Sequence, residues 1–221
     1  MVPELLRAVV VVDYQNVHLT GHGVFAPGEP KHKCLIDPGR FGRKLIQVRN
    51  SKQRHAKYHA DLSRVVVYRG LPIPEHDPDD YARNQAQKAE WMKDPLVEVN
   101  YRPLKYQVLR DRDGRPASDS NGRQIVKSKQ EKGIDVLCAL ALVREAMMEG
   151  VDLVILASQD TDLAPALEEA HSVGGAKIET VSWYEPKNYR SREIRSSAVR
   201  LWNTRLSESD FRACLDTRSY A

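Results

Sequence analysis

Short apolar runs recur along the chain and are separated by longer stretches in which apolar residues have helical spacing. The first run, residues 8–12, is continuous and β-branched, which is typical of a strand covered on both faces in a parallel sheet. Comparable runs lie at residues 64–68, 97–101, 152–157 and 176–181, and helical patterns lie at residues 38–59, 79–93, 134–149, 161–173 and 191–199. This alternation predicts an α/β fold: a three-layer, doubly wound, mostly parallel sheet with ligands at the carboxyl ends of its strands.

One segment interrupts the alternation. Two short strand patterns flank two clusters of turn-forming residues, which predicts a β-hairpin arm inserted at about residues 103–130. Residues 20–37 contain three glycines and two prolines and are expected to form a loop, and no internal repeat is apparent. We therefore expect one domain over residues 1–205, followed by a C-terminal tail at residues 206–221.

The composition is that of a globular chain. Of 221 residues, 41% are hydrophobic and 29% are charged, and 34 Lys and Arg against 30 Asp and Glu give a formal net charge of +4. That charge is too small to indicate a partner by itself. Three widely separated cysteines favour a reducing compartment. The first apolar run is far shorter than the roughly 20 residues of a membrane span, and no secretory signal is apparent. We expect a cytoplasmic protein with no membrane partner.

Four aspartates follow predicted strands or begin a predicted helix. Asp13 ends the first strand, Asp160 and Asp162 follow the fourth, and Asp135 lies in the first turn of an apolar helix. The carboxyl ends of parallel strands share one edge, so these side chains are expected to converge. Two unit charges ~4 Å apart repel by ~4 kcal/mol at an effective dielectric near 20. The cluster therefore predicts a bound hard cation, Mg²⁺ or Mn²⁺, which suits phosphodiester hydrolysis without a protein nucleophile.

Each aspartate also has a purely structural interpretation. Asp160 or Asp162 suits the cap of the helix that follows, Asp135 suits a first-turn carboxylate facing a helix dipole, and Asp13 suits a turn at the end of a strand. The helix at residues 134–149 is apolar nearly all round and is expected to be deeply buried, which makes Asp135 conspicuous.

A second, weaker candidate metal site lies in the predicted loop. His18, His22, His32 and Cys34 offer imidazoles and a thiolate at spacings that zinc accepts, although they fit no tight paired-ligand pattern. The sequence has no Gly-x-x-x-x-Gly-Lys phosphate-binding loop and no Gly-x-Ser-x-Gly nucleophile elbow, so it does not indicate a P-loop nucleotidase or a serine hydrolase.

Three motifs resemble those of NYN domains, a branch of the PIN-like nucleases. Val-Val-Asp-Tyr-Gln-Asn at residues 11–16 resembles the Asp-x-x-Asn opening of these domains. Lys-Gly-Ile-Asp-Val at residues 132–136 resembles their Lys-Gly-x-Asp-Val helix start, and Ser-Gln-Asp-Thr-Asp-Leu at residues 158–163 resembles their Ser-Gly-Asp-Ser-Asp-Phe element. The order and spacing of the three motifs match over roughly residues 8–205.

The resemblance implies a PIN-like, Rossmann-like fold and a Mg²⁺- or Mn²⁺-dependent endoribonuclease. It implies a metal-binding and catalytic acidic set with one polar neighbour: Asp13, Asp135, Asp160 and Asp162, with Asn16 beside them. The sequence departs from the family pattern at Gln159, where the family usually has Gly, and at Leu163, where it usually has Phe. The larger side chain of Gln159 bears on how closely backbone and substrate approach the metal.

Basic side chains gather in stretches that border the same predicted edge. The candidate RNA-binding residues are Lys127, Lys129, Lys132, Arg190, Arg192 and Arg195. Four strand-end aromatics are candidates for stacking on unpaired bases, which favours single-stranded RNA: Tyr14, Tyr68, Trp183 and Tyr184. These residues also suit a solvated face and ordinary packing. Two alternative functions stay open: a catalytically weak RNA-binding or regulatory module, and a phosphohydrolase of small nucleotides.

Overall fold

The computed structural model describes residues 4–120 and 122–220, and its main feature is a six-stranded sheet. The strand order is β3-β2-β1-β6-β7-β8, and all neighbouring strands are parallel. The strands are β1 (Leu6–Asp13), β2 (Ala60–Leu71), β3 (Val97–Pro103), β6 (Leu153–Ala157), β7 (Lys177–Trp183) and β8 (Trp202–Leu206). The predicted α/β fold class is confirmed, and β8 is added at one edge of the five predicted strands.

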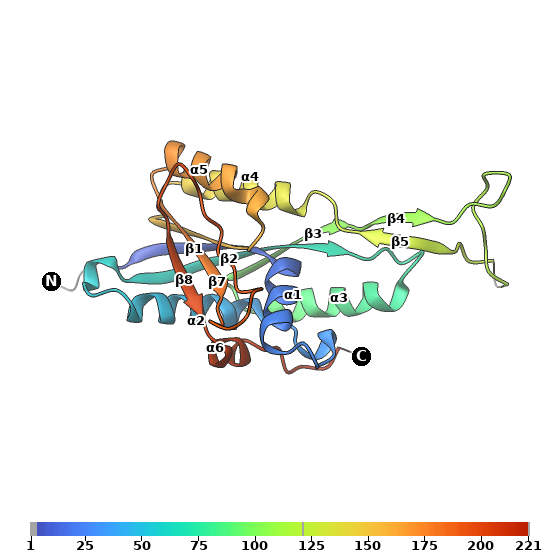
Figure 1. Ribbon diagram of the computed structural model, residues 1–221, viewed down its shortest axis with the longest axis horizontal. Helices are drawn as coiled ribbons and strands as arrows, with labels where there is room; N and C mark the ends of the chain where they lie inside the picture. The colour runs from blue at the N-terminus through green and yellow to red at the C-terminus, as the bar shows by residue number, and fades with distance from the viewer. Residues whose placement is uncertain (1–3, 121, 221) are drawn as a thin grey trace.

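Helices cover both faces of this sheet (Figure 1). One face carries α1 (Tyr14–Phe25), α2 (Pro38–Ser51), α3 (Pro78–Trp91) and α6 (Glu208–Ala213). The other face carries α4 (Ile134–Ala146) and α5 (Ala164–Val173). Short 3₁₀ helices lie at Lys31–Lys33, Ala56–Tyr58 and Thr161–Leu163. Within the two described ranges, no helix is both long and apolar enough to cross a membrane.

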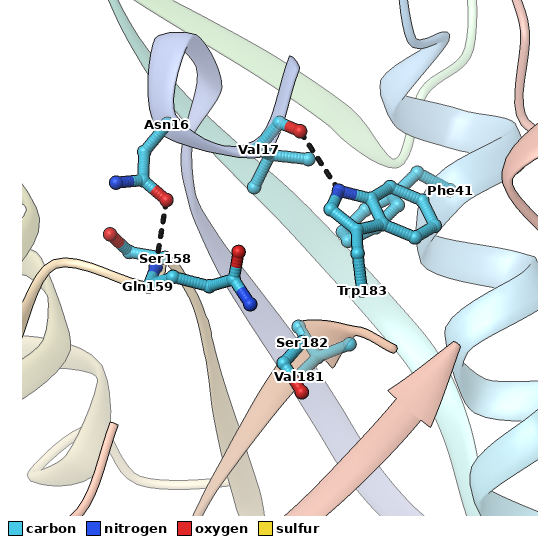
Figure 2. Close-up of a pocket in the computed structure, with 8 residues that line it drawn as sticks. All are labelled: Asn16, Val17, Phe41, Ser158, Gln159, Val181, Ser182 and Trp183. Carbon is cyan, nitrogen blue, oxygen red and sulfur yellow. Dashed lines mark hydrogen bonds between the residues drawn. The ribbon is translucent and has the colours of Figure 1, made fainter. Parts of the chain in front are cut away.

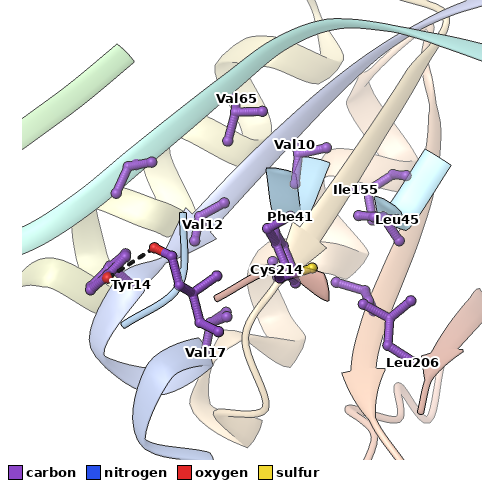
Figure 3. Close-up of a cluster of buried hydrophobic side chains, with 14 of the residues drawn as sticks. Val10, Val12, Tyr14, Val17, Phe41, Leu45, Val65, Ile155, Leu206 and Cys214 are labelled. Carbon is purple, nitrogen blue, oxygen red and sulfur yellow. Dashed lines mark hydrogen bonds between the residues drawn. The ribbon is translucent and has the colours of Figure 1, made fainter. Parts of the chain in front are cut away.

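The alternation of side chains along β1 divides the core into two parts. Val10 and Val12 face the α1 and α2 side, where they pack in one cluster with Phe41 (Figure 3). Val9 and Val11 face the opposite side, in the cluster that includes α4 and α5. Because both faces of the strand are buried, the strand needs no polar alternation. This arrangement explains the continuous apolar run in the sequence.

The sheet has a topological switch point between β1 and β6. Strands β2 and β3 lie on one side of β1, while β6, β7 and β8 lie on the other. The segment after β1 continues into α1 on one face, and the segment after β6 leads to α5 on the opposite face. Ligands of such sheets bind where the following segments diverge, at the carboxyl ends of the strands. The switch point therefore places Asp13 and residues 158–160 at the expected binding edge.

The predicted hairpin arm is confirmed as a separate two-stranded antiparallel sheet, β4 (Lys105–Val108) and β5 (Val126–Gln130). Figure 1 shows that the arm projects beyond the body of the domain. Its base is tied to the start of α3, because Asp77 Oδ2 accepts hydrogen bonds from Tyr106 Oη at 2.5 Å and Lys129 Nζ at 3.1 Å. The arm thus has an anchored base and an exposed tip.

Two predicted helices differ from the structure. The helix expected at residues 38–59 ends at Ser51, because the Asn50 side chain exchanges two hydrogen bonds with the backbone of Ala60, at 2.8 and 2.9 Å, and turns the chain into β2. The helix predicted at residues 191–199 is wrong, since that segment is irregular. There Ser196 Oγ accepts the backbone N–H groups two and three residues later, a local turn that competes with helix formation.

Helix α4 is less buried than its composition predicts. Val136, Leu140 and Met147 are 54%, 62% and 63% exposed, so one side of the helix faces away from the sheet, and the expectation of deep burial all round was wrong. The loop expected at residues 20–37 begins only after Phe25, where α1 ends.

The segment after residue 205 differs from the tail expected at residues 206–221. Its helix α6 buries Phe211 completely, and the following Cys214 is also fully buried. Trp91 Nε1 then donates a hydrogen bond to Asp216 Oδ2 at 2.7 Å. A single phenylalanine among charged residues gave little apolar signal in the sequence, yet it fills the core beside α1 and α2.

Candidate active site

Asp13 joins the two segments that diverge at the switch point. Its side chain is 7% exposed at the end of β1. Oδ1 accepts the Asn16 backbone N–H at 3.1 Å and caps α1, while Oδ2 accepts the Ser158 hydroxyl at 3.3 Å. The turn interpretation of Asp13 is thus confirmed as part of its geometry, and the same carboxylate is held at the binding edge.

Asp160 caps the 3₁₀ helix that follows β6. Its Oδ1 accepts the backbone N–H of Asp162 at 3.0 Å, and its own N–H donates to Ser158 Oγ at 3.1 Å. The cap interpretation is therefore confirmed for Asp160. The side chain of Asp162 is exposed and is not among those that line the acidic pocket described next.

Three of the four predicted aspartates share one open pocket. Asp13, Asp135 and Asp160 line a cavity of about 400 Å³ together with Lys132 and the first turn of α4. Gly133, which precedes α4, has a φ of 76° and supplies no side-chain cap. The backbone N–H groups at the start of α4 therefore lie at the pocket without a capping side chain, an arrangement that favours anions.

The structure adds a fourth carboxylate, Glu131, to this pocket. Its Oε1 accepts the backbone N–H of Gly70 at 2.5 Å, which brings the end of the arm against β2. The Gln15 amide faces the same carboxylate, and with its nitrogen turned inward it lies 2.7 Å from Oε2. Glu131 was not predicted from the sequence, although its position one residue before the Lys132–Gly133 pair was a usable signal.

Negative charge is concentrated in this pocket. Burial raises the pKa of the Asp13 carboxyl to about 6, and the charges of Asp160 and Asp135 add to this effect, against hydrogen bonds from Asn16 and Ser158 that lower it. Burial likewise raises the pKa of the Glu131 carboxyl, and the negative charge of Asp13 contributes to this rise. Among the described residues, none of the ion pairs involves any of the four pocket carboxylates.

The donor set fits a hard cation in its chemistry. All candidate ligands are carboxylate oxygens, and the buried Asp13 is destabilised by its negative neighbours. Across residues 4–120 and 122–220, however, no three or more His, Cys, Asp or Glu side chains are grouped closely enough to hold an ion. The carboxylates line one cavity without meeting at ligand distances.

Asn16 connects the ends of β1 and β6. Its Oδ1 accepts the backbone N–H of Gln159 at 2.7 Å, as Figure 2 shows. Together with Ser158 and Trp183, these residues line a void of only about 10 Å³. The Gln159 side chain points away from Asn16, and its Nε2 donates to the backbone carbonyl of Arg192. Asn16 and Gln159 thus brace the loops that carry the aspartates.

The basic residues predicted on the arm differ in availability. Lys132 lines the acidic pocket, and Lys127 is exposed on β5. Lys129, in contrast, forms ion pairs with Asp77 and Asp80, each at 3.1 Å. Its ammonium group thus holds the arm against α3, and its predicted role in RNA binding stays a prediction.

The three arginines predicted after β7 also differ. Arg190 lies over the ring of Tyr189, 5.6 Å from its centroid, and Arg195 pairs with Glu193 at 3.1 Å. The exposed Arg192 and Arg195 line a second cavity, of about 440 Å³, together with Thr161, the residue after Asp160. Both side chains therefore border the loop that carries Asp160.

Most of the predicted base-stacking residues are packing residues. Tyr14, Tyr68 and Trp183 are 1%, 6% and 3% exposed, so the stacking prediction was wrong for these three. Trp183 Nε1 donates to the carbonyl of Val17 at 2.8 Å, which fixes the ring inside the core. Tyr184 is half-buried beneath the guanidinium of a neighbouring arginine, 4.4 Å from its ring centroid.

The alternative zinc site is not assembled. His18 Nε2 and His22 Nε2 lie 3.0 and 2.7 Å from backbone carbonyl oxygens, and burial lowers the pKa of His18 to about 4. Cys34 is buried with its thiol directed at Glu29, while His32 is exposed. In the described part of the chain these groups do not form a metal-binding cluster.

Comparison with known proteins gives few matches. No family model matches the chain, and no curated protein matches it. A solved structure that it resembles is a protein of unknown function from Vibrio parahaemolyticus, with 19% sequence identity and a TM-score of 0.43. The match covers 80% of this chain and 81% of that one.

Proposed function

We propose that this chain is a ribonuclease of the NYN type that hydrolyses phosphodiester bonds of single-stranded RNA with Mg²⁺ or Mn²⁺. Asp13, Asp135 and Asp160 would hold the ion, with Glu131 beside them, and Asp162 remains a predicted contributor from the adjacent 3₁₀ helix. We place the activity in the cytoplasm, since all three cysteines are buried thiols outside any disulfide.

The observation that carries the proposal is the buried Asp13 carboxylate in a pocket of like charges. It lies at the switch point of a parallel sheet, and burial and two neighbouring aspartates raise its pKa to about 6. A purely structural cap gains nothing from such neighbours, whereas a hard cation would relieve the repulsion. The position, the oxygen donors and the uncompensated charge all suit a divalent-ion site.

The chain's own groups have distinct tasks in this proposal. When bound, the ion supplies activation of water and stabilisation of charge on the phosphodiester. Ser158 and Asn16 hold the two aspartate-bearing loops in register through their bonds to Asp13 and to the Gln159 backbone. Lys132 and the uncapped N–H groups of α4 offer positive charge to a phosphate at the rim of the pocket.

The test is cleavage of an end-labelled, unstructured RNA with Mn²⁺, Mg²⁺ or a chelator. We expect metal-dependent cleavage by the wild type and its loss in Asp160→Asn, which keeps the cap geometry but lowers the charge of the site. The matched control is Asp61→Asn, an exposed aspartate at the amino end of β2, on the opposite edge of the sheet. Cleavage that persists in chelator, or in Asp160→Asn, would contradict the proposal.

A second candidate is an RNA-binding module that does not cleave. It is favoured by the fact that Asp13 and Asp160 already act as caps and that the pocket carboxylates do not meet at ligand distances. This candidate predicts that RNA binding persists in chelator and after both aspartates are changed to asparagine, with no cleavage under any metal condition.

A further inference from the structure

We propose that the tip of the arm is a second RNA-binding element. It holds the phosphate backbone of the RNA about 25 Å from the acidic pocket. This inference rests on the proposed RNA substrate but not on the cleavage chemistry. The arm is defined here as residues 105–130, and its tip as residues 109–125. The tip is built from a repeat that was not apparent in the sequence.

Two eight-residue units, 109–116 and 117–124, form the tip, and apart from residue 121, which lies outside the described residues, they share a backbone pattern. Leu109, Ala117 and Ile125 occupy equivalent places and are joined in a ring of backbone bonds: Leu109 N to Ile125 O at 2.8 Å, Ala117 N to Leu109 O at 2.8 Å and Ile125 N to Ala117 O at 2.9 Å. The expectation that the chain has no internal repeat was therefore wrong for this segment. Because the similarity rests on few identical residues, the structure shows it more plainly than the sequence.

Each unit carries a loop closed by an aspartate and followed by an arginine. In the first loop Asp111 Oδ1 accepts the backbone N–H of Arg115 at 2.9 Å, and in the second Asp119 Oδ1 accepts that of Arg123 at 2.9 Å. The glycine before each arginine, Gly114 or Gly122, has a φ of 76° or 75°, a conformation that suits glycine. The two loops are thus matched, pre-formed carriers of a guanidinium group.

These guanidinium groups are available for a ligand. Arg112, Arg115 and Arg123 are exposed, and within residues 4–120 and 122–220 no hydrogen bond or ion pair involves their side chains. Asp111 uses its carboxylate to hold backbone N–H groups of its own loop. The charges therefore project from the end of the arm without an acidic partner from the body of the domain (Figure 1).

The arm also carries the net positive charge of the protein. Residues 105–130 contain seven Lys and Arg and three Asp, a net charge of +4, which equals the formal charge of the whole chain. The other 195 residues are therefore neutral in sum. A cationic, two-stranded projection on a neutral body suits contact with a polyanion that passes along it, since phosphate contacts supply sequence-independent affinity.

The geometry also sets the length of RNA that reaches the tip. Arg123 precedes Glu131 by eight residues, and extended backbone rises about 3.3 Å per residue, which gives roughly 25 Å between the second loop and the pocket. A stacked RNA strand rises ~3.4 Å per nucleotide, so the span corresponds to about seven nucleotides. The tip should therefore strengthen the binding of long RNA and leave the binding of very short RNA unchanged.

The experiment measures binding of fluorescent oligouridines of 5 and 20 nucleotides by anisotropy, in chelator, over a salt series. The variant Arg112→Gln/Arg115→Gln/Arg123→Gln is compared with a control that also loses three cations, Arg54→Ala/Lys57→Ala/Arg200→Ala, at the amino edge of the sheet. For the tip variant we expect a slope of log affinity against log salt that is smaller by about 2, and a 20-mer affinity weaker by roughly tenfold to hundredfold at 0.1 M salt.

The outcomes separate this inference from the proposed function. Equal 20-mer binding by the tip variant and the wild type would overturn it, as would equal losses in the tip variant and the control. A tip variant that changes sedimentation but not RNA affinity would show that the tip binds another copy of the chain instead. If the tip variant loses affinity while Mn²⁺ yields no cleavage in the wild type, the tip inference stands and the ribonuclease proposal fails.

Discussion

Neutralising Asp13 should make the metal-free protein more stable. In the folded chain the carboxyl has a pKa of about 6, against an ordinary value of 3.8, chiefly because it is buried. Between these two values the folded state holds the proton more tightly than the unfolded state. The free energy of unfolding therefore falls as pH rises through this window, and the loss is complete above pH 6. Asp13→Asn removes that loss while an amide oxygen can still cap α1.

The magnitude follows from the two pKa values. A difference of about 2 pH units corresponds to about 3 kcal/mol at neutral pH. Loss of the favourable interaction between a carboxylate and the start of α1 offsets up to about 1 kcal/mol. A net gain of about 2 kcal/mol in a chain of this size raises the melting temperature by roughly 4–8 °C. The gain should shrink steadily as the pH is lowered from 6 to 4.

The assay is thermal unfolding of wild type and Asp13→Asn in chelator between pH 4 and 8, repeated with Mn²⁺. Only the wild type should gain stability from Mn²⁺, by about 2.7 kcal/mol at 100 times the dissociation constant. Asp37→Asn is the matched control, because Asp37 caps α2 in the same way but pairs with Arg218, and its replacement should destabilise. If Asp13→Asn destabilises the protein at pH 7.5 as Asp37→Asn does, the Asp13 carboxylate is a favourable structural group, which would refute this prediction.

Three further changes test the contacts around the sheet. Arg49→Met should lower the free energy of unfolding in urea by roughly 2–3 kcal/mol. It removes the buried partner that contacts Glu179 at 2.8 and 3.0 Å and leaves that carboxylate with only the half-exposed Lys177, at 2.7 Å. A loss below about 1 kcal/mol would contradict this. Asn16→Ala should cost about 1–3 kcal/mol in the same urea assay, by leaving the Gln159 N–H unpaired. An unchanged free energy of unfolding would contradict this. Gln159→Gly should speed tryptic cleavage after Arg192 roughly fivefold, because the hydrogen bond from the Gln159 side chain to the Arg192 carbonyl is lost. An unchanged cleavage rate would show that this bond does not hold the chain around Arg192 in place.

Much of the fold was predictable because its signals are local. Short runs rich in apolar and β-branched residues predicted five of the six parallel strands, and the β1 run is continuous because that strand is buried on both faces. The convergence of Asp13 with Asp160 followed from the rule that parallel strands end at one edge, and β1 and β6 are neighbours. Strand β8 was missed because only Thr204 and Leu206 of its five residues are buried.

The contacts that were not predicted join segments far apart in the chain. Lys129 looked available in the sequence, but the arm folds its base against α3 and places the ammonium group between Asp77 and Asp80. Glu131 enters the pocket through a bond to the backbone of Gly70, 61 residues away in the chain. Neither contact leaves a periodic or local signal, so only the three-dimensional arrangement separates a paired lysine from a free one.

The structural and functional interpretations of Asp13 are compatible. Each carboxylate oxygen has two lone pairs, and Asp13 uses one on Oδ1 for the Asn16 N–H and one on Oδ2 for Ser158. An asparagine or serine would cap α1 about as well without the cost of a buried charge. A cap is worth about 1 kcal/mol, whereas the raised pKa corresponds to about 3 kcal/mol of lost stability at neutral pH. A need for helix capping alone therefore does not account for an aspartate at this position, whereas the proposed ion, which would use the remaining lone pairs, would account for it.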